Sequence, residues 1–544
     1  MAFGENIPPY VFEKQDKGIE IDIISAALAY KGYTLKPLYF PLARIPMAFK
    51  NKQVDATMGD MGIDLTMHGG FYASPAVTYD NVFISLKSKN YVIKKPSDLD
   101  KLLVVPRHFL IISLCGLLAV VWYFIPHPAV IVAVGMLPFA ILIVLEYPFF
   151  MVLLFVIFSF FRIHEVIPQL YNFKIPLLLS LASIASMSWN VFFKKRFSLW
   201  WRPEFTSLMT FYVLVSIGVV MASNLPVAMG YYLNIYVKIA IMSFAIAWLI
   251  TRESEFVIAS VAIVIAGWIV GIKALSNKAL GIGLVEETRV TIGRVFGSVL
   301  GDPNDLSLVL MFPAAFAVGF IVNKGMNYPT KFFGIVSICI LFSAVLATQS
   351  RGGLLGIMAV FGIYAYRRIK NKLLFFLIGI IGALVLYQVA GISERASGGA
   401  AEEGVDASAM GRIYAWEAAI GMATDNPLTG VGIDNFFSNY FFYSPHWDGL
   451  NHAVHSTWFG VLAETGILGF IVFVITIVML VKTALRTLST IEANDTYFSP
   501  MIKTVAEALL AGMMGTLVAG TFLTVGFSWP IYISGALIVS LAHW

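Results

Sequence analysis

The feature that most limits the fold of this chain is a succession of apolar runs, many about 20 residues long, that begins near Phe109. A run of that length spans a bilayer as an α-helix, because the helix satisfies its backbone hydrogen bonds internally. The composition agrees, since 58% of the 544 residues are hydrophobic and only 13% are charged. Soluble proteins carry about 25% charged residues. The sequence therefore predicts a polytopic α-helical membrane protein.

The apolar runs predict about 12–14 transmembrane helices. The predicted spans are 109–125, 129–145, 148–162, 175–193, 205–222, 231–250, 256–272, 304–323, 331–348, 353–366, 373–391, 456–481, 504–525 and 528–543. The 129–162 region is open to two interpretations, either two short spans or one re-entrant pair. Cys115 and Cys339 both lie inside apolar runs, so no disulfide is predicted.

Basic residues cluster in four loops that fall on one side when the spans alternate. The clusters are Lys194, Lys195, Arg196 and Arg202; Lys324 and Lys331; Arg367, Arg368, Lys370 and Lys372; and Lys482 and Arg486. The positive-inside rule makes this side cytoplasmic. The opposite side receives the segments 273–303, 349–352 and 392–455, which we therefore expect to face outward.

Residues 1–101 have the composition of a soluble α/β segment, with charges spread throughout. They resemble the first lobe of a periplasmic solute-binding protein of the amino-acid type, through PPYVF at 8–12, GIEIDIISAALAYKG at 18–32, the VDA at 54–56 and PSDLD at 96–100. Membrane helices begin where the crossing to a second lobe is expected, and GIDLTMHGG lacks the basic ligand of a carboxylate. We therefore predict a truncated, non-binding lobe, on the cytoplasmic side by the alternation of spans.

The sequence predicts four regions. These are a partial solute-binding-protein-like lobe at 1–101, transmembrane helices at 102–391, a long periplasmic loop with the catalytic motif at 392–455, and C-terminal transmembrane helices at 456–544.

The segment from Gly411 to Gly469 is the longest polar interlude of the chain. Its ionisable groups include Arg412, Asp425, Asp434, His446, Asp448, His452, His455 and Glu464. Its start, RIYAWEAAIGMA, has apolar residues at helical spacing and predicts an amphipathic helix on the membrane face, ended by the DNP at 425–427. The apolar positions of that helix are Ile413, Trp416, Ala419 and Ile420.

Three arginines on the outward side are candidate phosphate ligands. Arg294 precedes the DPND at 302–305, where Asn304 or Asp305 suits the cap of the next helix. Arg351 stands in a very short connection, and its guanidinium suits bidentate binding of a diphosphate. The alternative for Arg294 is an incidental place beside a helix cap, and for Arg351 contact with lipid phosphates.

His455 closes the polar segment one residue before an apolar run and is a candidate general base, because imidazole accepts a proton near neutral pH. Glu464 lies nine residues further on and is a distant supporting residue. We interpret His446 and His452 as structural. A zinc site formed by the three histidines is disfavoured, since neither an HExxH motif nor clustered cysteines accompany them.

These motifs together resemble the O-antigen ligase family of bacterial polytopic glycosyltransferases, over about residues 105–544. The matching residues are Arg294, Gly297 and the DPN at 302–304; the SRG at 350–352; Arg412, Trp416, the NP at 426–427, the GVG at 430–432 and the NF at 435–436; and His455, Ser456, the ETG at 464–466 and Gly469. Many members have Asn after the histidine, where this chain has Ser456.

The resemblance implies a fold and a reaction. It implies a helical membrane enzyme that moves a glycan from an undecaprenyl diphosphate carrier to an acceptor hydroxyl, with lipid A core as the expected acceptor, at the periplasmic face of the bacterial inner membrane. It assigns His455 as base and Arg294, Arg351 and Arg412 as diphosphate ligands, with Glu464, Trp416 and Asn304 in support. It implies inversion at the anomeric carbon and no metal or cofactor, and no nucleic acid as partner.

Three alternatives remain. An O-antigen polymerase or a protein O-oligosaccharyltransferase would share the chemistry and differ in acceptor. A secondary transporter would place ionisable residues near mid-helix and show internal repeats, whereas the charges here gather at helix ends. A membrane sensor would need a complete binding cleft and an output domain, and the sequence shows neither.

Overall fold

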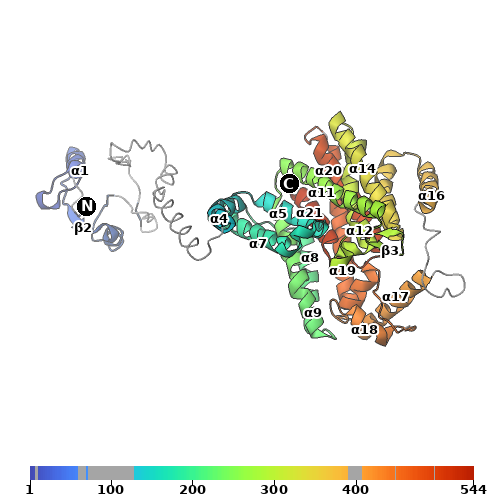
Figure 1. The fold of residues 1–544 in the computed structure, drawn as a ribbon. Coiled ribbons are helices and arrows are strands. Elements are labelled where there is room, and N and C mark those ends of the chain that lie inside the picture. The colour runs from blue at the N-terminus through green and yellow to red at the C-terminus, as the bar shows by residue number, and fades with distance from the viewer. Residues whose placement is uncertain (6–9, 59–68, 71–127, 390–406, 448, 495) are drawn as a thin grey trace. The chain divides into compact units, whose positions relative to one another are not determined.

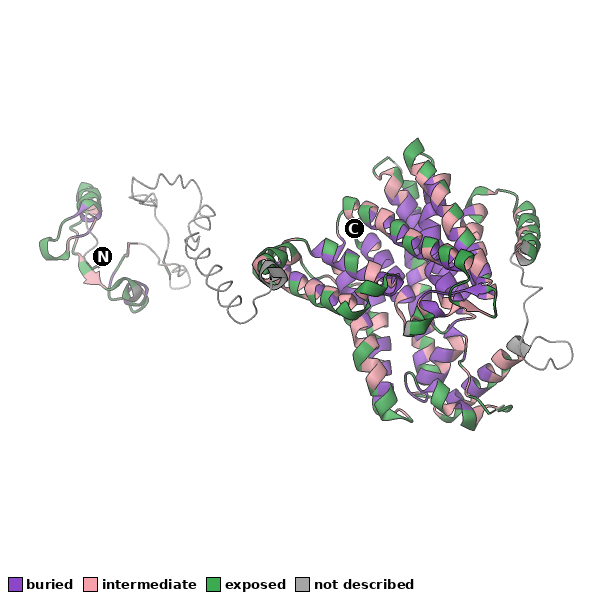
Figure 2. Ribbon diagram, viewed as in Figure 1, coloured by how far each residue is buried: buried purple, intermediate pink, exposed green. Residues whose placement is uncertain are grey.

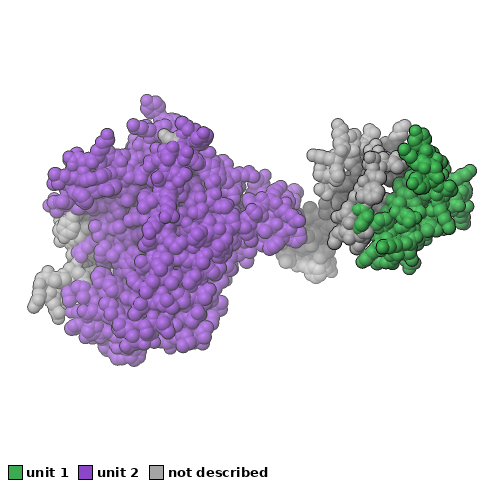
Figure 3. All heavy atoms as spheres, turned by 180° about the vertical axis from the view of Figure 1, so that it is seen from behind, with its two compact units in different colours: residues 1–120 green, residues 121–544 purple. Residues whose placement is uncertain are grey.

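The computed structural model describes residues 1–5, 10–58, 69–70, 128–389, 407–447, 449–494 and 496–544 (Figure 1). The chain divides into two compact units, residues 1–120 and 121–544, which Figure 3 colours separately.

The N-terminal unit begins with a small β-α-β arrangement. Strand β1 (Ala2–Gly4) pairs in parallel with β2 (Leu38–Phe40), and helix α1 (Ile19–Tyr30) connects them. Gly32 follows α1 with φ +80°, a conformation that glycine adopts without strain. The short helix α2 (Ile45–Lys50) comes next. The α/β character predicted for this segment is therefore present, whereas the solute-binding resemblance stays a prediction and its last motif, at 96–100, lies outside the described residues.

The second unit is a bundle of helices. In chain order these are α4 (Pro128–Glu146), α5 (Pro148–Phe160), α6 (Ile163–Val166), α7 (Ile175–Ser188), α8 (Pro203–Val220), α9 (Leu225–Tyr231), α10 (Val237–Leu249), α11 (Glu253–Leu280), α12 (Pro303–Val309), α13 (Met311–Val322), α14 (Tyr328–Thr348), α15 (Arg351–Arg368), α16 (Lys372–Val389), α17 (Ala407–Asp425), α18 (Phe436–Tyr443), α19 (Thr457–Ala493), α20 (Pro500–Gly520) and α21 (Trp529–His543). A two-stranded hairpin of β3 (Leu284–Val285) and β4 (Arg289–Val290) precedes α12.

Within the described ranges, eight helices are long and apolar enough to span a membrane, or nine if one bent pair counts as a single span. This confirms the polytopic helical fold. The number is smaller than the 12–14 predicted for three reasons. The 109–125 run lies outside the described residues; α15 carries Arg351, Arg367 and Arg368 within its 18 residues; and the apolar parts of α16 and α21 are shorter.

The bent pair is formed by α4 and α5, whose axes differ by 95° at the junction of Tyr147 and Pro148. Proline at the first position of α5 cannot continue the hydrogen bonding of α4, and its fixed φ suits the start of a new helix. The sequence left two interpretations of this region, and the bend is the geometry of a broken span or a re-entrant pair.

Helices α13 and α20 lie at the centre of the bundle (Figure 2). In the spans Pro303–Val322 and Pro500–Gly520, 83% and 72% of the most apolar part of the helix is buried inside the bundle. The corresponding values are 22% for Ile175–Phe193 and 28% for Tyr328–Thr348. The latter two spans therefore lie at the periphery of the bundle. The close approach of α13 and α20 requires Gly512, because a Cβ there would lie 2.7 Å from the ring of Phe312.

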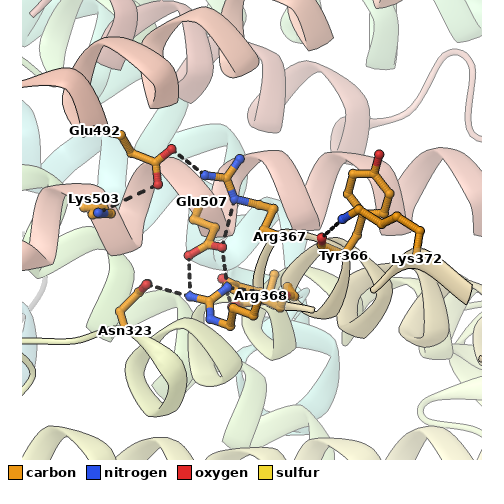
Figure 4. A network of polar contacts seen from close by, with 10 residues as sticks. Asn323, Tyr366, Arg367, Arg368, Lys372, Glu492, Lys503 and Glu507 are labelled. Carbon is orange, nitrogen blue, oxygen red and sulfur yellow. Dashed lines mark hydrogen bonds and ion pairs between the residues drawn. The ribbon is translucent and has the colours of Figure 1, made fainter. Parts of the chain in front are cut away.

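A network of ion pairs joins α15, α19 and α20 at one side of the bundle (Figure 4). Arg368 donates two hydrogen bonds to Glu507, at 2.6 and 2.9 Å, and Arg367 approaches the same carboxylate at 3.2 Å. Arg367 also donates to Glu492, and Arg368 to Asn323 at the end of α13. We call this side, where α13, α15 and α19 end, the basic face, and the opposite side, where α12, α15 and α19 begin, the loop face.

Candidate functional site

The site is built where four segments of the loop face meet the start of α19. The segments are the 289–305 region, the 349–351 connection, the start of α17, and the 521–528 connection between α20 and α21. The predicted site residues Arg294, Arg351, Arg412 and His455 all lie on these segments or directly before α19.

His455 has a backbone conformation that few residues adopt. Its φ is +45°, in the left-handed region, which costs a non-glycine residue free energy that the surrounding structure must offset. On one side, Trp416 of α17 donates its indole N–H to the carbonyl of Val454 at 3.2 Å. On the other side, the Thr457 hydroxyl donates to the carbonyl of Leu523 at 2.7 Å. The imidazole is therefore positioned from both neighbouring residues.

Trp416, which is predicted to support the site, also stacks its ring on Phe459 of α19 at 5.0 Å and 13°. On the packed side of α17, Ala415, Ala418, Ala419 and Met422 are fully buried, whereas Ile413 and Ile420 are 40% and 47% exposed. The predicted apolar positions therefore divide between the core and the exposed surface of the helix, and the contact of α17 with the membrane face stays a prediction.

The electrostatic surroundings of His455 favour the neutral imidazole. Burial and the positive charge of Arg412 lower the pKa of His455, Asp302 acts in the opposite direction, and His452 adds a smaller lowering effect. A neutral ring has a free nitrogen lone pair at neutral pH, which a general base requires. Arg412 lies one turn before Trp416 on α17, and its guanidinium stands 5.8 Å from the ring centroid of Phe522.

The loop with Arg294 is folded back on itself and leads into α12. The exposed Arg294 starts a single 3₁₀ turn and donates to the carbonyl of Gly301 at 3.4 Å. Asp302 caps α12 by accepting from the backbone N–H groups of Asn304, at 2.7 Å, and Asp305, at 3.3 Å. The expected cap, Asn304 or Asp305, is therefore wrong, because the carboxylate of Asp302 reaches the first free N–H groups of the helix.

Asn304 instead connects three segments of the site. Its Oδ1 accepts from Nη2 of Arg289 at 2.9 Å and from the hydroxyl of Ser350 at 2.7 Å. Ser350 caps α15 through the N–H of Gly353, which fixes the position of Arg351 as the first residue of that helix. Asn304 thus holds the short 349–351 connection against the start of α12.

Arg289 lies at this junction although it is not among the predicted site residues. It is only 4% exposed, and Nε donates to the carbonyl of Thr348 at 3.2 Å while Nη2 donates to Asn304. Its position in a two-residue strand, 59 positions before Thr348, carries no local signal of this contact. A buried guanidinium satisfied by oxygen acceptors stabilises the junction of β4, α12 and α15.

Glu464 does not contact His455 in the described structure. It is 7% exposed and accepts a hydrogen bond from the backbone N–H of Phe436 at 3.2 Å, so it fixes the turn that begins α18. Nearby, Gly466 has φ +69° and a ψ of −174°, and a Cβ there would lie 2.6 Å from the carbonyl oxygen of Pro427. The carbonyl of Pro427 accepts from Ile467 at 2.8 Å, so the 426–432 turn is docked on this kink of α19.

Two further histidines lie against tyrosine rings. His446 stands 4.2 Å from Tyr414 and His452 stands 5.4 Å from Tyr440, between ring centroids. Across the described ranges, no group of three or more His, Cys, Asp or Glu side chains is arranged to hold a metal ion.

Residues 335–474 match the family model Wzy_C, described as O-Antigen ligase. The matched segment runs from α14 to the kinked part of α19 and contains Arg351, Arg412 and His455, while Arg294 precedes it. No curated protein matches the chain. Over residues 335–474 the chain is therefore similar to the O-antigen ligase family.

Proposed function

We propose that the protein transfers a glycan from an undecaprenyl diphosphate carrier to the hydroxyl of an acceptor, with lipid A core as the acceptor, at the periplasmic face of the inner membrane. The observation that carries the proposal is the placement of His455. The backbone of His455 has a left-handed conformation, and the pKa of its imidazole is lowered by burial and by Arg412. The family match supplies the class of reaction.

In the proposed reaction, His455 accepts the proton of the acceptor hydroxyl while the oxygen attacks the anomeric carbon. The bond from that carbon to the carrier diphosphate breaks, and the diphosphate leaves with the bonding electrons. Arg294, Arg351 and Arg412 stabilise the charge that develops on the leaving group, the task that preorganised cationic groups perform in phosphate chemistry. Direct attack inverts the anomeric carbon and needs no covalent enzyme intermediate.

The test is glycan transfer in membranes of a host that lacks its own O-antigen ligase. The intact protein is expected to yield glycan-capped lipid A core, and His455→Ala and Arg351→Ala are expected to abolish the product at unchanged protein amounts. His446→Ala is the matched control, because His446 is exposed in the same segment and contacts Tyr414 instead. Its activity is expected to persist.

Two outcomes would change the proposal. If polymer lengthens on the carrier and never reaches lipid A core, the protein is a polymerase that uses the same site. If His455→Ala retains full transfer, the assignment of the base is wrong, and His452 is the next residue to substitute.

A further inference from the structure

A cavity of ≈ 690 Å³ lies on the loop face beside the candidate site, and the proposed reaction does not use it. Its walls come from α5, the 162–174 connection, the start of α10, the first turns of α12 and the 524–530 segment. Phe155, Leu177 and Trp529 provide apolar surface. Helix α7, which contributes Leu177, belongs to the span Ile175–Phe193, of which only 22% is buried, so this wall lies at the periphery of the bundle.

The charged side chains that line the cavity are mostly cationic. Arg162, Lys174 and Lys238 face one carboxylate, Asp305. Arg162 is already paired with Glu165. The ammonium groups of Lys174 and Lys238 have no hydrogen bond or ion pair with any residue that the structure describes. Burial lowers the pKa of His164, which also lines the cavity, so its imidazole adds no charge near neutral pH.

The place of Lys238 makes an unbalanced charge costly. It lies within the candidate span Leu225–Leu249 and is half-buried. Ionisable groups in membrane spans are expensive unless an opposite charge or water compensates them, and they mark ligand sites more often than structural positions. The charge of Lys238 therefore requires a compensating anion that no described residue paired with it supplies.

A buried hydroxyl points to the same kind of ligand. Ser159 of α5 lines the cavity, is 6% exposed, and its Oγ has no hydrogen-bond partner within the described ranges. Buried hydroxyls are almost always bonded, and in a helix Ser commonly bonds to a carbonyl of the preceding turn. An anionic oxygen in the cavity would accept from Ser159 and from the two lysines, and phosphate offers several such oxygens.

Two short segments lie between the cavity and the candidate site, and each contributes residues to both. On the first, Asp302 acts on the pKa of His455, while Asp305, three residues later, lines the cavity. On the second, Phe522 lies beneath Arg412, while Thr524 and Val525 line the cavity. A ligand held in the cavity therefore lies next to the reacting groups without occupying their place.

We propose that this cavity binds a phosphate group on the head of the acceptor lipid, whose acyl chains lie against the apolar wall, while the arginines near His455 hold the carrier diphosphate. The inference rests on the proposed transfer to a lipid acceptor. It assigns Lys174, Lys238 and Ser159 to acceptor binding, a part of the reaction that neither His455 nor the arginines explain.

The test measures lipid binding by the purified full chain in dodecyl maltoside, a detergent without phosphate. The probes are bisphosphorylated lipid A core, the same lipid after dephosphorylation, and undecaprenyl diphosphate. The wild type is expected to prefer the phosphorylated lipid about tenfold, because charge-assisted hydrogen bonds to the phosphate are lost with the group. Lys174→Gln and Lys238→Gln should remove most of that preference and leave carrier binding unchanged. Lys273→Gln, on α11 away from the cavity, is the control and should keep both.

Equal binding of the two lipid A forms by the wild type would overturn the proposal, as would a preference that survives in both lysine variants. A loss of undecaprenyl diphosphate binding instead would assign the cavity to the carrier and overturn the acceptor assignment. Lys174 is exposed, so its variant tests the charge without a risk to folding, and Ser159→Ala adds a variant without a charge change. The assay contains no glycan donor, so missing transferase activity cannot cause the loss of preference.

Discussion

The two ends of α15 carry arginines in opposite surroundings. At the basic face, Arg367 and Arg368 share the 3%-exposed carboxylate of Glu507, and Glu492 and Lys503 extend the network. At the loop face, the helix starts at Arg351 beside Asn304 and Ser350, and the nearby Arg294 donates to a neutral carbonyl. Cations matched by carboxylates stabilise the bundle, whereas Arg294, whose hydrogen bond goes to the neutral carbonyl of Gly301, keeps a positive potential that can act on an anionic substrate.

This difference predicts which property each end controls. Substitutions at the loop face should reduce transfer and leave the free energy of unfolding nearly unchanged. Substitutions at the basic face should reduce stability and leave the transfer rate of the folded protein unchanged.

The largest effect is expected at His455. His455→Asn should lower the transfer rate at least about a hundredfold, the lower bound for loss of a general base. Asparagine tolerates the left-handed φ of +45° better than alanine does, so this variant should keep the local backbone. Transfer assays and thermal unfolding of the purified variant check both statements. A variant that is inactive because it unfolds would contradict the comparison.

The next effect is expected at Glu507 on the opposite face. Glu507→Gln leaves Arg367 and Arg368 without their buried carboxylate, which should cost about 3 kcal/mol of unfolding free energy. Glu492→Gln is the control, because Glu492 is 39% exposed and its loss should cost less than about 1 kcal/mol. Unfolding in detergent gives the stability, and transfer normalised to folded protein gives the activity. Loss of transfer in folded Glu507→Gln protein would remove the distinction between the two faces.

A smaller effect is expected at Trp416, which acts through the backbone next to His455. Trp416→Phe removes the hydrogen bond to Val454 and keeps an aromatic ring against Phe459, so the local loss should be about 1 kcal/mol. The transfer rate is expected to fall several-fold with little change in the affinity for either substrate. An unchanged rate would show that Thr457 alone positions the imidazole.

The smallest effect is a shift in the pH dependence. Because the neutral form of His455 accepts the proton and its pKa is lowered, transfer should persist below pH 6.5 and fall only at more acidic pH. Arg412→Gln removes a positive charge that contributes to the lowering, so the acidic limb should move to higher pH even though the rate also falls. The measurement is the transfer rate between pH 5 and pH 8. If the acidic limb of the pH–rate profile does not move in Arg412→Gln, the charge of Arg412 does not act on the pKa of His455.

Much of the helical framework could be predicted from the sequence, because an apolar run of sufficient length is a local property. The runs at 175–193 and 331–348 correspond closely to Ile175–Phe193 and Tyr328–Thr348. Arg351, Arg412 and His455 are singled out by a motif, and their roles in the site stay predictions. The cap at Asp302, the buried Arg289 and the cavity around Lys238 depend on contacts between distant segments, and hydropathy carries no information about those contacts.

Gly466 interrupts the helical backbone of α19 (Thr457–Ala493), because its φ of +69° and ψ of −174° are not helical. At about 1.5 Å per residue the part 467–493 is about 40 Å long, whereas a hydrocarbon layer is about 30 Å thick. Its far end carries Glu492, which is paired with Arg367 of α15 and with Lys503. The anchored helix therefore fixes the place of Gly466, and the break there sets the direction of the short helix 457–465 that His455 precedes.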